Sequence, residues 1–354
     1  MTVSRMPPRS DHFPGRRRLA GAAAALALLL AGCSTDPIDS STAASSASVD
    51  EILRPGPQTA TLAEPYVTPE STPTPDLPVT VTDFGGSEVT VTDASRIIAL
   101  DRYGTLAQTV LALGLGGSIV GRDVPTDDPT VADVPVVTDS GHRLTPEAIL
   151  DLDPTVLLVD SSIGPPEAID RVREAGVPVV TFDPGRSVDT VTTQIEAVGA
   201  ALGVPDAASD LAGRVGDEIA AARATIPAGT EDVTATFVYL RGAALQLMAG
   251  PGSGADDLIA ALGATDAATV AGQTQPFLAI TTEAMIAADP DVILVMAAGA
   301  ESVGGLDAVA QLPGIAQTSA GSNDRIIAMD DSYILGFGPR TGRVLSALAD
   351  AMYR

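Results

Sequence analysis

The spacing of apolar residues along residues 79–354 alternates between that of strands and that of helices. Apolar and polar positions alternate in residues 79–82 and 89–92, on either side of Phe84-Gly85-Gly86-Ser87, which predicts a β-hairpin. Short apolar runs then predict strands at 96–100, 118–121, 156–159, 177–182, 234–240, 292–296 and 325–329. Helical spacing between them predicts helices at 105–113, 166–175, 255–262, 304–311 and 340–353. This order of elements indicates parallel α/β units.

One segment of the chain occurs twice. Residues 144–159, Leu-Thr-Pro-Glu-Ala-Ile-Leu-Asp-Leu-Asp-Pro-Thr-Val-Leu-Leu-Val, match residues 280–295, Ile-Thr-Thr-Glu-Ala-Met-Ile-Ala-Ala-Asp-Pro-Asp-Val-Ile-Leu-Val. Each copy predicts a helix with Thr145 or Thr281 as its N-cap, a stop at Asp-Pro and a buried strand. The repeat therefore predicts two similar lobes, an N-terminal lobe at 79–186 and a C-terminal lobe at 227–354.

The residues between the lobes, 187–226, have apolar positions at helical spacing, interrupted by a turn at Gly203-Val-Pro-Asp. Two lobes joined by one long helical connector enclose a cleft that closes only slightly, which suits a large, rigid ligand. The alternative is a pair of domains that act independently.

The N-terminus predicts export and lipidation. Arg16, Arg17 and Arg18 precede an apolar run at 19–30 that is too short to span a bilayer comfortably. The following Leu30-Ala31-Gly32-Cys33 resembles a bacterial lipobox. That resemblance implies a signal peptide at 1–32, cleavage before Cys33 and a lipid anchor on Cys33. An ordinary secretory signal is the alternative, and the general and twin-arginine export routes both stay open.

Residues 33–78 are rich in Ser, Thr, Ala and Pro and show almost no apolar periodicity. We expect them to form a disordered tether behind the anchor.

Composition narrows the classes of partner. Every one of the 20 basic residues is Arg, and the net charge is −25. Cleavage at Cys33 would remove five Arg and one Asp, leaving 15 Arg against 44 acids and a net charge of −29. Such an excess of acid argues against nucleic acid or an anionic membrane surface as a partner. Cleavage also removes His12, so His142 becomes the single histidine of the mature chain.

Residues 79–354 resemble the metal-chelate solute-binding proteins of type II ABC importers, which carry siderophores, cobalamin and haem. The resemblance rests on the hairpin with Arg96-Ile-Ile-Ala-Leu, on Leu113-Gly-Leu-Gly with Ile119-Val-Gly-Arg, on the 146–159 segment and on Leu258-Ile-Ala-Ala-Leu-Gly. It implies a class III solute-binding fold of two Rossmann-like lobes with the ligand in the cleft. It also implies a non-enzymatic receptor on the outer face of the cell membrane, which delivers cargo to a permease and its ATPase.

Two short motifs resemble the haem-transporting members of this family. Asp139-Ser-Gly-His142-Arg-Leu-Thr-Pro-Glu matches the first-lobe ligand loop, and Tyr239-Leu-Arg241-Gly matches a second-lobe motif of the actinobacterial haem-binding lipoproteins. The resemblance implies that His142 and Tyr239 are the axial ligands of ferric haem. Strand side chains alternate, so Arg241 lies on the face of Tyr239 and can stabilise its phenolate. Asp101-Arg-Tyr-Gly-Thr-Leu departs from the family's Gly-x-x-Thr-Glu and leaves the contacts of that stretch open.

Further candidates have a plain alternative role as surface or core residues. Haem propionates could pair with Arg102, Arg143 and Arg340, and the porphyrin could contact Tyr103, Tyr333, Phe277 and Phe337. Thioether candidates are Met248 and Met296, and acids that could dock on the permease are Glu167, Asp256 and Asp257. Proteins that donate haem upstream are further candidate partners.

Several other functions are less favoured. A ferric siderophore or cobalamin receptor of the same family is the main alternative, although cobalamin sites favour Trp and this chain has none. One histidine cannot build the usual site for bare zinc. The chain lacks a Gly-x-Ser-x-Gly elbow and a phosphate loop, which argues against an enzyme. A surface adhesion module is less favoured by a cleft between lobes.

Lipidation can be tested directly. Cys33→Ser removes the only thiol, so the variant is expected to lose incorporation of a labelled fatty acid, measured by gel after metabolic labelling. Ser34→Ala is the control and should keep the label. A labelled Cys33→Ser protein would exclude the anchor.

Overall fold

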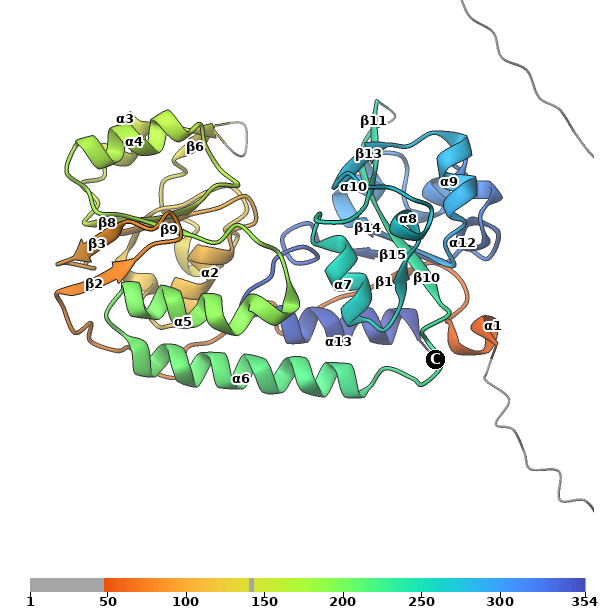
Figure 1. Ribbon diagram of the computed structural model, residues 1–354, viewed down its shortest axis with the longest axis horizontal. Coiled ribbons are helices and arrows are strands. Elements are labelled where there is room, and N and C mark those ends of the chain that lie inside the picture. The colour runs from red at the N-terminus through yellow and green to blue at the C-terminus, as the bar shows by residue number, and fades with distance from the viewer. Residues whose placement is uncertain (1–47, 140–142, 243, 354) are drawn as a thin grey trace, which may run out of the picture. The chain divides into compact units, whose positions relative to one another are not determined.

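The computed structural model describes residues 48–139, 143–242 and 244–353, which belong to one compact unit with two β-sheet lobes (Figure 1). The lobes confirm the predicted mixed α/β architecture with parallel sheets. None of the helices in these ranges is long and apolar enough to cross a membrane.

A four-stranded parallel sheet forms the centre of the first lobe. Its order is β5 (Ile119–Gly121), β4 (Ile97–Leu100), β8 (Val156–Asp160), β9 (Val179–Phe182). Strands β4 and β8 are buried at every position, because helices cover both faces. Ile97 and Ala99 pack with one set of helices, while Ile98 and Leu100 pack with the other. The sets are α2 (Thr105–Ala112) with α5 (Val191–Ala201), and α3 (Pro146–Leu150) with α4 (Pro166–Glu174).

Smaller elements complete this lobe. The predicted hairpin is present as β2 (Val79–Thr82) and β3 (Glu88–Val91), with Val79 opposite Val91. A short antiparallel pair consists of β6 (Thr138–Asp139) and β7 (Arg143–Leu144). Single 3-10 turns occur at Gly116–Ser118, Pro129–Val131 and Val188–Thr190.

The second lobe is built on a mixed seven-stranded sheet. The strand order is β1 (Gln58–Thr59), β15 (Ile326–Met329), β14 (Val292–Met296), β10 (Thr234–Arg241), β11 (Leu245–Ala249), β13 (Phe277–Ala279), and β12 (Thr265–Asp266) also pairs with β10. Its helices are α7 (Ala255–Ala261), α8 (Ala267–Val270), α9 (Thr282–Ala288), α10 (Ala297–Glu301), α11 (Leu306–Ala310) and α12 (Ser319–Ser322), with a 3-10 turn at Ile315–Gln317. Strands β11 and β13 run antiparallel, and the sequence analysis did not predict them.

The internal repeat folds as predicted in both lobes. Thr145 is the N-cap residue of α3, and Thr281 is the N-cap residue of α9, where its side chain accepts from Ala284 N. The following strands, β8 and β14, are each buried throughout. Each copy therefore places one fully buried parallel strand within its own sheet.

Two helices form the connector between the lobes. Helix α5 is followed by α6 (Pro205–Ala224), and the predicted turn separates them. Helix α6 packs against α5, which itself packs on the first-lobe elements α2 and β9, and against α13 (Thr341–Met352) of the second lobe (Figure 1). The connector is thus fixed to both lobes along the length of one 20-residue helix.

Residues 48–78, named here the strap, correct the predicted tether. They begin with α1 (Val49–Ile52), bury Leu53 completely and add β1 to the edge of the second-lobe sheet. Arg340 then donates to the Pro65 carbonyl, and the amide of Asp76 donates to Gly203 between the connector helices. The prediction failed because it was made from composition. An extended, Pro-rich segment that is ordered by hydrogen bonds to its backbone has the same composition as a disordered linker. The predicted tether residues 33–47 lie outside the described ranges.

Candidate binding pocket

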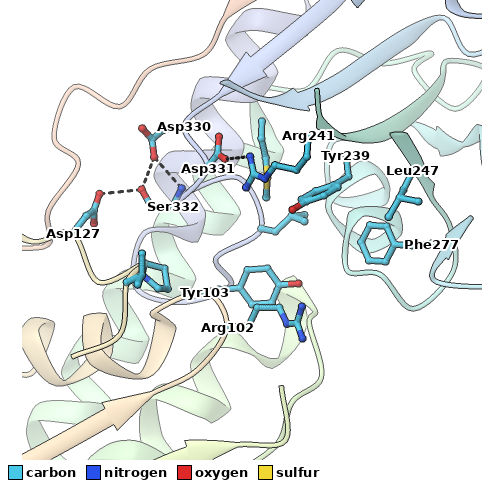
Figure 2. A pocket seen from close by; sticks show the side chains of 14 residues that line it. Arg102, Tyr103, Asp127, Tyr239, Arg241, Leu247, Phe277, Asp330, Asp331 and Ser332 are labelled. Carbon is cyan, nitrogen blue, oxygen red and sulfur yellow. Dashed lines mark hydrogen bonds and ion pairs between the residues drawn. The ribbon is translucent and has the colours of Figure 1, made fainter. Parts of the chain in front are cut away.

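A cavity of about 720 Å³ is lined by residues from both lobes (Figure 2). Its volume lies in the range of about 300–1,000 Å³ that is typical of small-molecule sites. The first lobe contributes Arg102, Tyr103, Val124, Pro125 and Asp127. The second lobe contributes Tyr239, Arg241, Leu247, Phe277, Met296 and, from the loop after β15, Asp330, Asp331, Ser332 and Leu335.

Tyr239 and Arg241 form the polar centre of the second-lobe wall. They lie two residues apart near the end of β10 and both line the pocket, as strand alternation predicts. The Arg241 guanidinium lies 5.1 Å from the centre of the Tyr239 ring and forms an ion pair with Asp331 at 3.2 Å. Partial burial acts to lower the pKa of Arg241, but Tyr239 and Asp331 outweigh it and raise that pKa. A permanent positive charge therefore lies beside the Tyr239 ring.

Apolar groups surround this pair on the second lobe. Leu247 lies opposite Tyr239 on the neighbouring strand β11, and Phe277 comes from β13. Met296 ends β14, next to β10, and lines the same cavity. Leu335, from the loop after β15, also lines the cavity, so the strands that sequence reasoning missed supply two of the four apolar residues of this wall.

The first-lobe wall comes from the turn after β4. The buried Asp101 carboxylate accepts from Tyr103 N at 2.8 Å and from Leu106 N at 2.7 Å, and Gly104 adopts a φ of +70° between them. These contacts define the backbone conformation of residues 101–106, the stretch whose sequence departs from the family pattern. Burial raises the pKa of Tyr103, with the charges of Arg186 and Arg102 opposing it. Tyr103 is therefore a neutral phenol at physiological pH.

Charge is distributed unevenly around the pocket. Asp127, Asp330 and Asp331 lie on one side, where Ser332 Oγ bonds Asp127 Oδ2 at 2.9 Å and also bonds Asp330. Arg102 lies on the opposite side of the view in Figure 2, and its guanidinium donates to the Ser162 carbonyl at 3.2 Å. An anionic group of a ligand is accordingly favoured near Arg102.

The structure does not support Arg340 as a propionate contact. Its side chain is only 4% exposed and donates to the carbonyls of Pro65 and Ser332, while stacking over Tyr333 at 4.4 Å. Burial lowers the pKa of Arg340. A cation with these backbone contacts is a structural link between the strap and the second lobe.

The remaining predicted contacts fall in three places. His142 lies outside the described residues. Arg143 is exposed on β7 but does not line the cavity. Of the other candidates, Phe277, Met296 and Tyr103 line the cavity, whereas Tyr333, Phe337 and Met248 do not. Phe337 and Met248 are buried core residues.

The three predicted docking acids differ in their surroundings. Glu167 is exposed in the first turn of α4. Asp256 accepts from Gly252 N and Gly254 N at 2.8 and 3.0 Å. Asp257 accepts from Val188 N at 2.6 Å. Asp256 therefore stabilises the turn before α7, whereas Asp257 holds a backbone amide 69 residues away, and the sequence revealed neither role.

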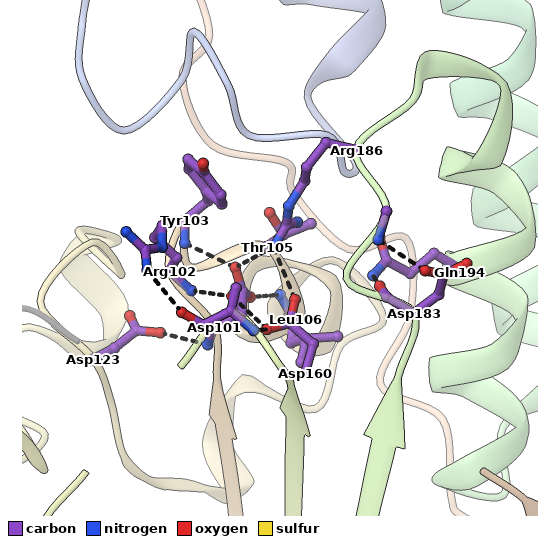
Figure 3. A network of polar contacts seen from close by, with 12 residues as sticks. Asp101, Arg102, Tyr103, Thr105, Leu106, Asp123, Asp160, Asp183, Arg186 and Gln194 are labelled. Carbon is purple, nitrogen blue, oxygen red and sulfur yellow. Dashed lines mark hydrogen bonds and ion pairs between the residues drawn. The ribbon is translucent and has the colours of Figure 1, made fainter. Parts of the chain in front are cut away.

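A buried polar network lies behind the first-lobe wall (Figure 3). Asp101, Asp123 and Asp160 are fully buried, and Arg186 pairs with Asp160 at 2.8 Å and with Asp101 at 3.4 Å. Burial and the neighbouring Asp101 raise the pKa of Asp123 to about 7. Burial and Asp101 also raise the pKa of Asp160, with Arg186 opposing. Sequence reasoning missed this network, since these residues are far apart in the sequence and no local pattern pairs them.

No cluster of three or more His, Cys, Asp or Glu in the described part of the chain is arranged to hold a metal ion.

The family profile and the solved structures that resemble this chain point to the same protein family. The profile of the periplasmic binding protein family matches residues 102–333. The crystal structure of the haem-binding protein HmuT is 38% identical, covers 84% of this chain and 97% of its own, and superposes with a TM-score of 0.79. Variants of HmuT with a tyrosine, a histidine or an arginine replaced by alanine also have crystal structures.

Two further relatives show the range of ligands. The periplasmic haem-binding protein RhuT from Roseiflexus sp. RS-1 is 40% identical over 73% of this chain and 98% of its own, with a TM-score of 0.67. A cobalamin-binding protein from Halobacterium salinarum is 26% identical over 78% of this chain and 74% of its own length. The likeness to haem-binding proteins is thus the stronger of the two.

The raised pKa of Asp123 predicts a pH dependence of stability. A carboxyl that holds its proton more tightly when folded contributes stability below pH 4, and that contribution is lost as pH rises to about 7. The free energy of unfolding of Asp123→Asn, relative to wild type, is expected to rise over this interval by a few kcal/mol, at about 1.4 kcal/mol per pKa unit. Urea unfolding at several pH values measures it.

The exposed Asp133→Asn variant is the control and should show the wild-type pH dependence. If the free energy of unfolding changed with pH in the same way for wild type and Asp123→Asn, the raised pKa of Asp123 would be contradicted.

Proposed function

The chain belongs to the periplasmic binding protein family, and from that premise we propose that it captures ferric haem outside the cytoplasm and delivers it to an ABC permease. The observation that carries the proposal is the Tyr239–Arg241 pair in the pocket wall, facing the first lobe. The likeness to HmuT and RhuT, both haem-binding proteins, supports haem over other cargo.

Tyr239 is the proposed second-lobe ligand. Phenolate oxygen is a good ligand for ferric iron, and the positively charged guanidinium of Arg241 lies 5.1 Å from the centre of the Tyr239 ring. His142 is the proposed ligand from the first lobe, since a neutral imidazole nitrogen completes the axial pair. Two axial ligands leave no open coordination site on the iron, which fits a carrier rather than an enzyme.

The pocket walls suit a flat macrocycle with two carboxylates. Tyr103, Leu247 and Phe277 offer apolar surface to a porphyrin. Arg102 is the proposed partner of a propionate, whereas Asp127 and Asp330 on the other side would disfavour one, with the Asp331 charge paired to Arg241. This uneven charge would give haem one preferred orientation.

Delivery requires partners outside this chain. We propose that acyl chains on Cys33 hold the protein at the outer face of the membrane. The exposed Glu167 is a docking acid for the permease. In the second lobe, the backbone contacts of Asp256 and Asp257 favour a structural role instead. The ATPase acts through the permease, and haem donors would act upstream.

A cobalamin or ferric siderophore receptor is the second candidate. The Halobacterium salinarum relative is a cobalamin-binding protein, and the cavity volume alone does not separate these chelates. The Tyr239–Arg241 pair favours haem, because neither of the other chelates needs a phenolate ligand.

Haemin titration tests cargo and ligands together. The chain from Ser34 onward is expected to bind haemin stoichiometrically with a six-coordinate ferric visible spectrum. Tyr239→Phe removes only the ligating oxygen, and His142→Ala removes the imidazole, so each should change the spectrum. Tyr66→Phe, outside the pocket, is the matched control. Binding of aquocobalamin without haemin would move the assignment to the second candidate.

Arg241 predicts a pH effect on the bound spectrum. Arg241→Ala is expected to keep haemin binding but to raise the pH at which the phenolate–iron spectrum forms, because a positive charge beside the phenolate is lost. Arg241→Lys keeps the charge and should lie closer to wild type. A spectral titration unchanged by Arg241→Ala would show that the guanidinium does not support the phenolate.

A further inference from the structure

We infer that Arg186 is a positioning residue, which fixes the Tyr103 wall of the pocket to the junction between the two lobes. The inference rests on the proposed function in that Tyr103 is taken to contact the flat face of the cargo. Arg186 itself does not line the cavity and acts through Tyr103.

The guanidinium of Arg186 is held from two sides within the first lobe. It lies 4.5 Å from the centre of the Tyr103 ring, in the geometry of a cation–π contact. Both of its ion pairs, with Asp160 and Asp101, use the single nitrogen Nη2. The side chain is only 7% exposed, so these contacts are little screened by solvent.

The rest of the guanidinium has few polar partners. Within the described part of the chain, its buried Nε and Nη1 atoms form no hydrogen bond. An arginine whose role was only to neutralise acids would be expected to use its fork in bidentate pairs. Here both carboxylates pair with the single nitrogen Nη2, and the guanidinium lies over the Tyr103 ring.

The backbone at Arg186 is fixed by the second lobe. A Cβ atom on Gly254, which precedes α7, would lie 2.7 Å from the Cβ of Arg186, so the two segments are in close contact. Asp257 of α7 accepts from Val188 N at 2.6 Å and from Ser187 Oγ at 3.2 Å. Arg186 thus has its backbone at the second lobe and its charged end beneath the first-lobe wall.

This arrangement determines how freely the Tyr103 ring can move. One face of the ring is occupied by Arg186, while the residue lines the cavity. Without the guanidinium, the ring would gain rotamers and lose its fixed relation to the second lobe. A planar aromatic cargo would then dissociate faster, although no atom that touches it had been changed.

A double-mutant cycle on haemin affinity tests the inference. Arg186→Lys keeps a charge for the buried acids but lacks the flat guanidinium, so it should fold and weaken haemin binding about tenfold. Tyr103→Ala should weaken binding at least as much. If Arg186 acts through Tyr103, the double variant binds no more weakly than Tyr103→Ala. Fully additive losses would overturn the inference.

Arg325→Lys is the matched control. Arg325 is also buried, with 6% of its side chain exposed, and pairs with Asp50 of the strap away from the pocket. The Arg325→Lys variant should have a lower melting temperature than wild type and an unchanged affinity for haemin. An equal loss of affinity in Arg325→Lys would mean that general destabilisation explains the effect, which would also overturn the inference.

A measurement on the ligand-free protein separates this inference from the cargo assignment. The chain has five tyrosines, so 3-fluorotyrosine labelling gives few ¹⁹F resonances, and Tyr103→Phe identifies that of Tyr103. Arg186→Lys is expected to shift or broaden this resonance and leave the others in place. An unchanged Tyr103 resonance refutes the positioning role. A changed resonance in a protein that binds no haemin supports the positioning and refutes the cargo.

Discussion

Three carboxylates buried at the carboxyl ends of parallel strands hold the first-lobe side of the pocket in place. Asp101 follows β4, Asp123 follows β5 and Asp160 ends β8. Each accepts backbone hydrogen bonds from the loop that follows its strand, so the loops cannot move independently of the sheet. Buried charges are stable only when they are paired or protonated, and here one arginine and a raised pKa at Asp123 meet that need. The pocket residues of this lobe all follow from these three anchors.

Local patterns predicted the elements of the fold well. The alternation in the hairpin, the apolar runs at 156–159 in β8 and 292–296 in β14, and the N-caps at Thr145 and Thr281 each depend on neighbouring residues. The strap could not be predicted, because its order comes from backbone contacts with distant segments. The contacts of Arg340 could not be predicted for the same reason, since it donates to the carbonyl of Pro65, 275 positions away in sequence.

The candidate site was predictable only where it follows strand geometry. Tyr239 and Arg241 share a face because strand residues alternate, so their proximity could be read from the sequence. The partner of Arg241, Asp331, is 90 residues away and has no sequence signal. Arg186 and Asp101, 85 residues apart, meet only when the sheet brings the ends of β4 and β9 together. Long-range polar pairs are thus the part that an isolated sequence hides.

The strap also changes what the second-lobe sheet presents to other molecules. Strand β15 would be the outer strand of that sheet without β1, and its backbone groups would be open to pairing with any extended chain. Instead, Gln58 and Thr59 pair with Ile327 and Ala328, and the amide of Ala60 donates to Ala328. The strap thereby covers this edge of the sheet and protects the molecule against β-sheet pairing with other extended chains.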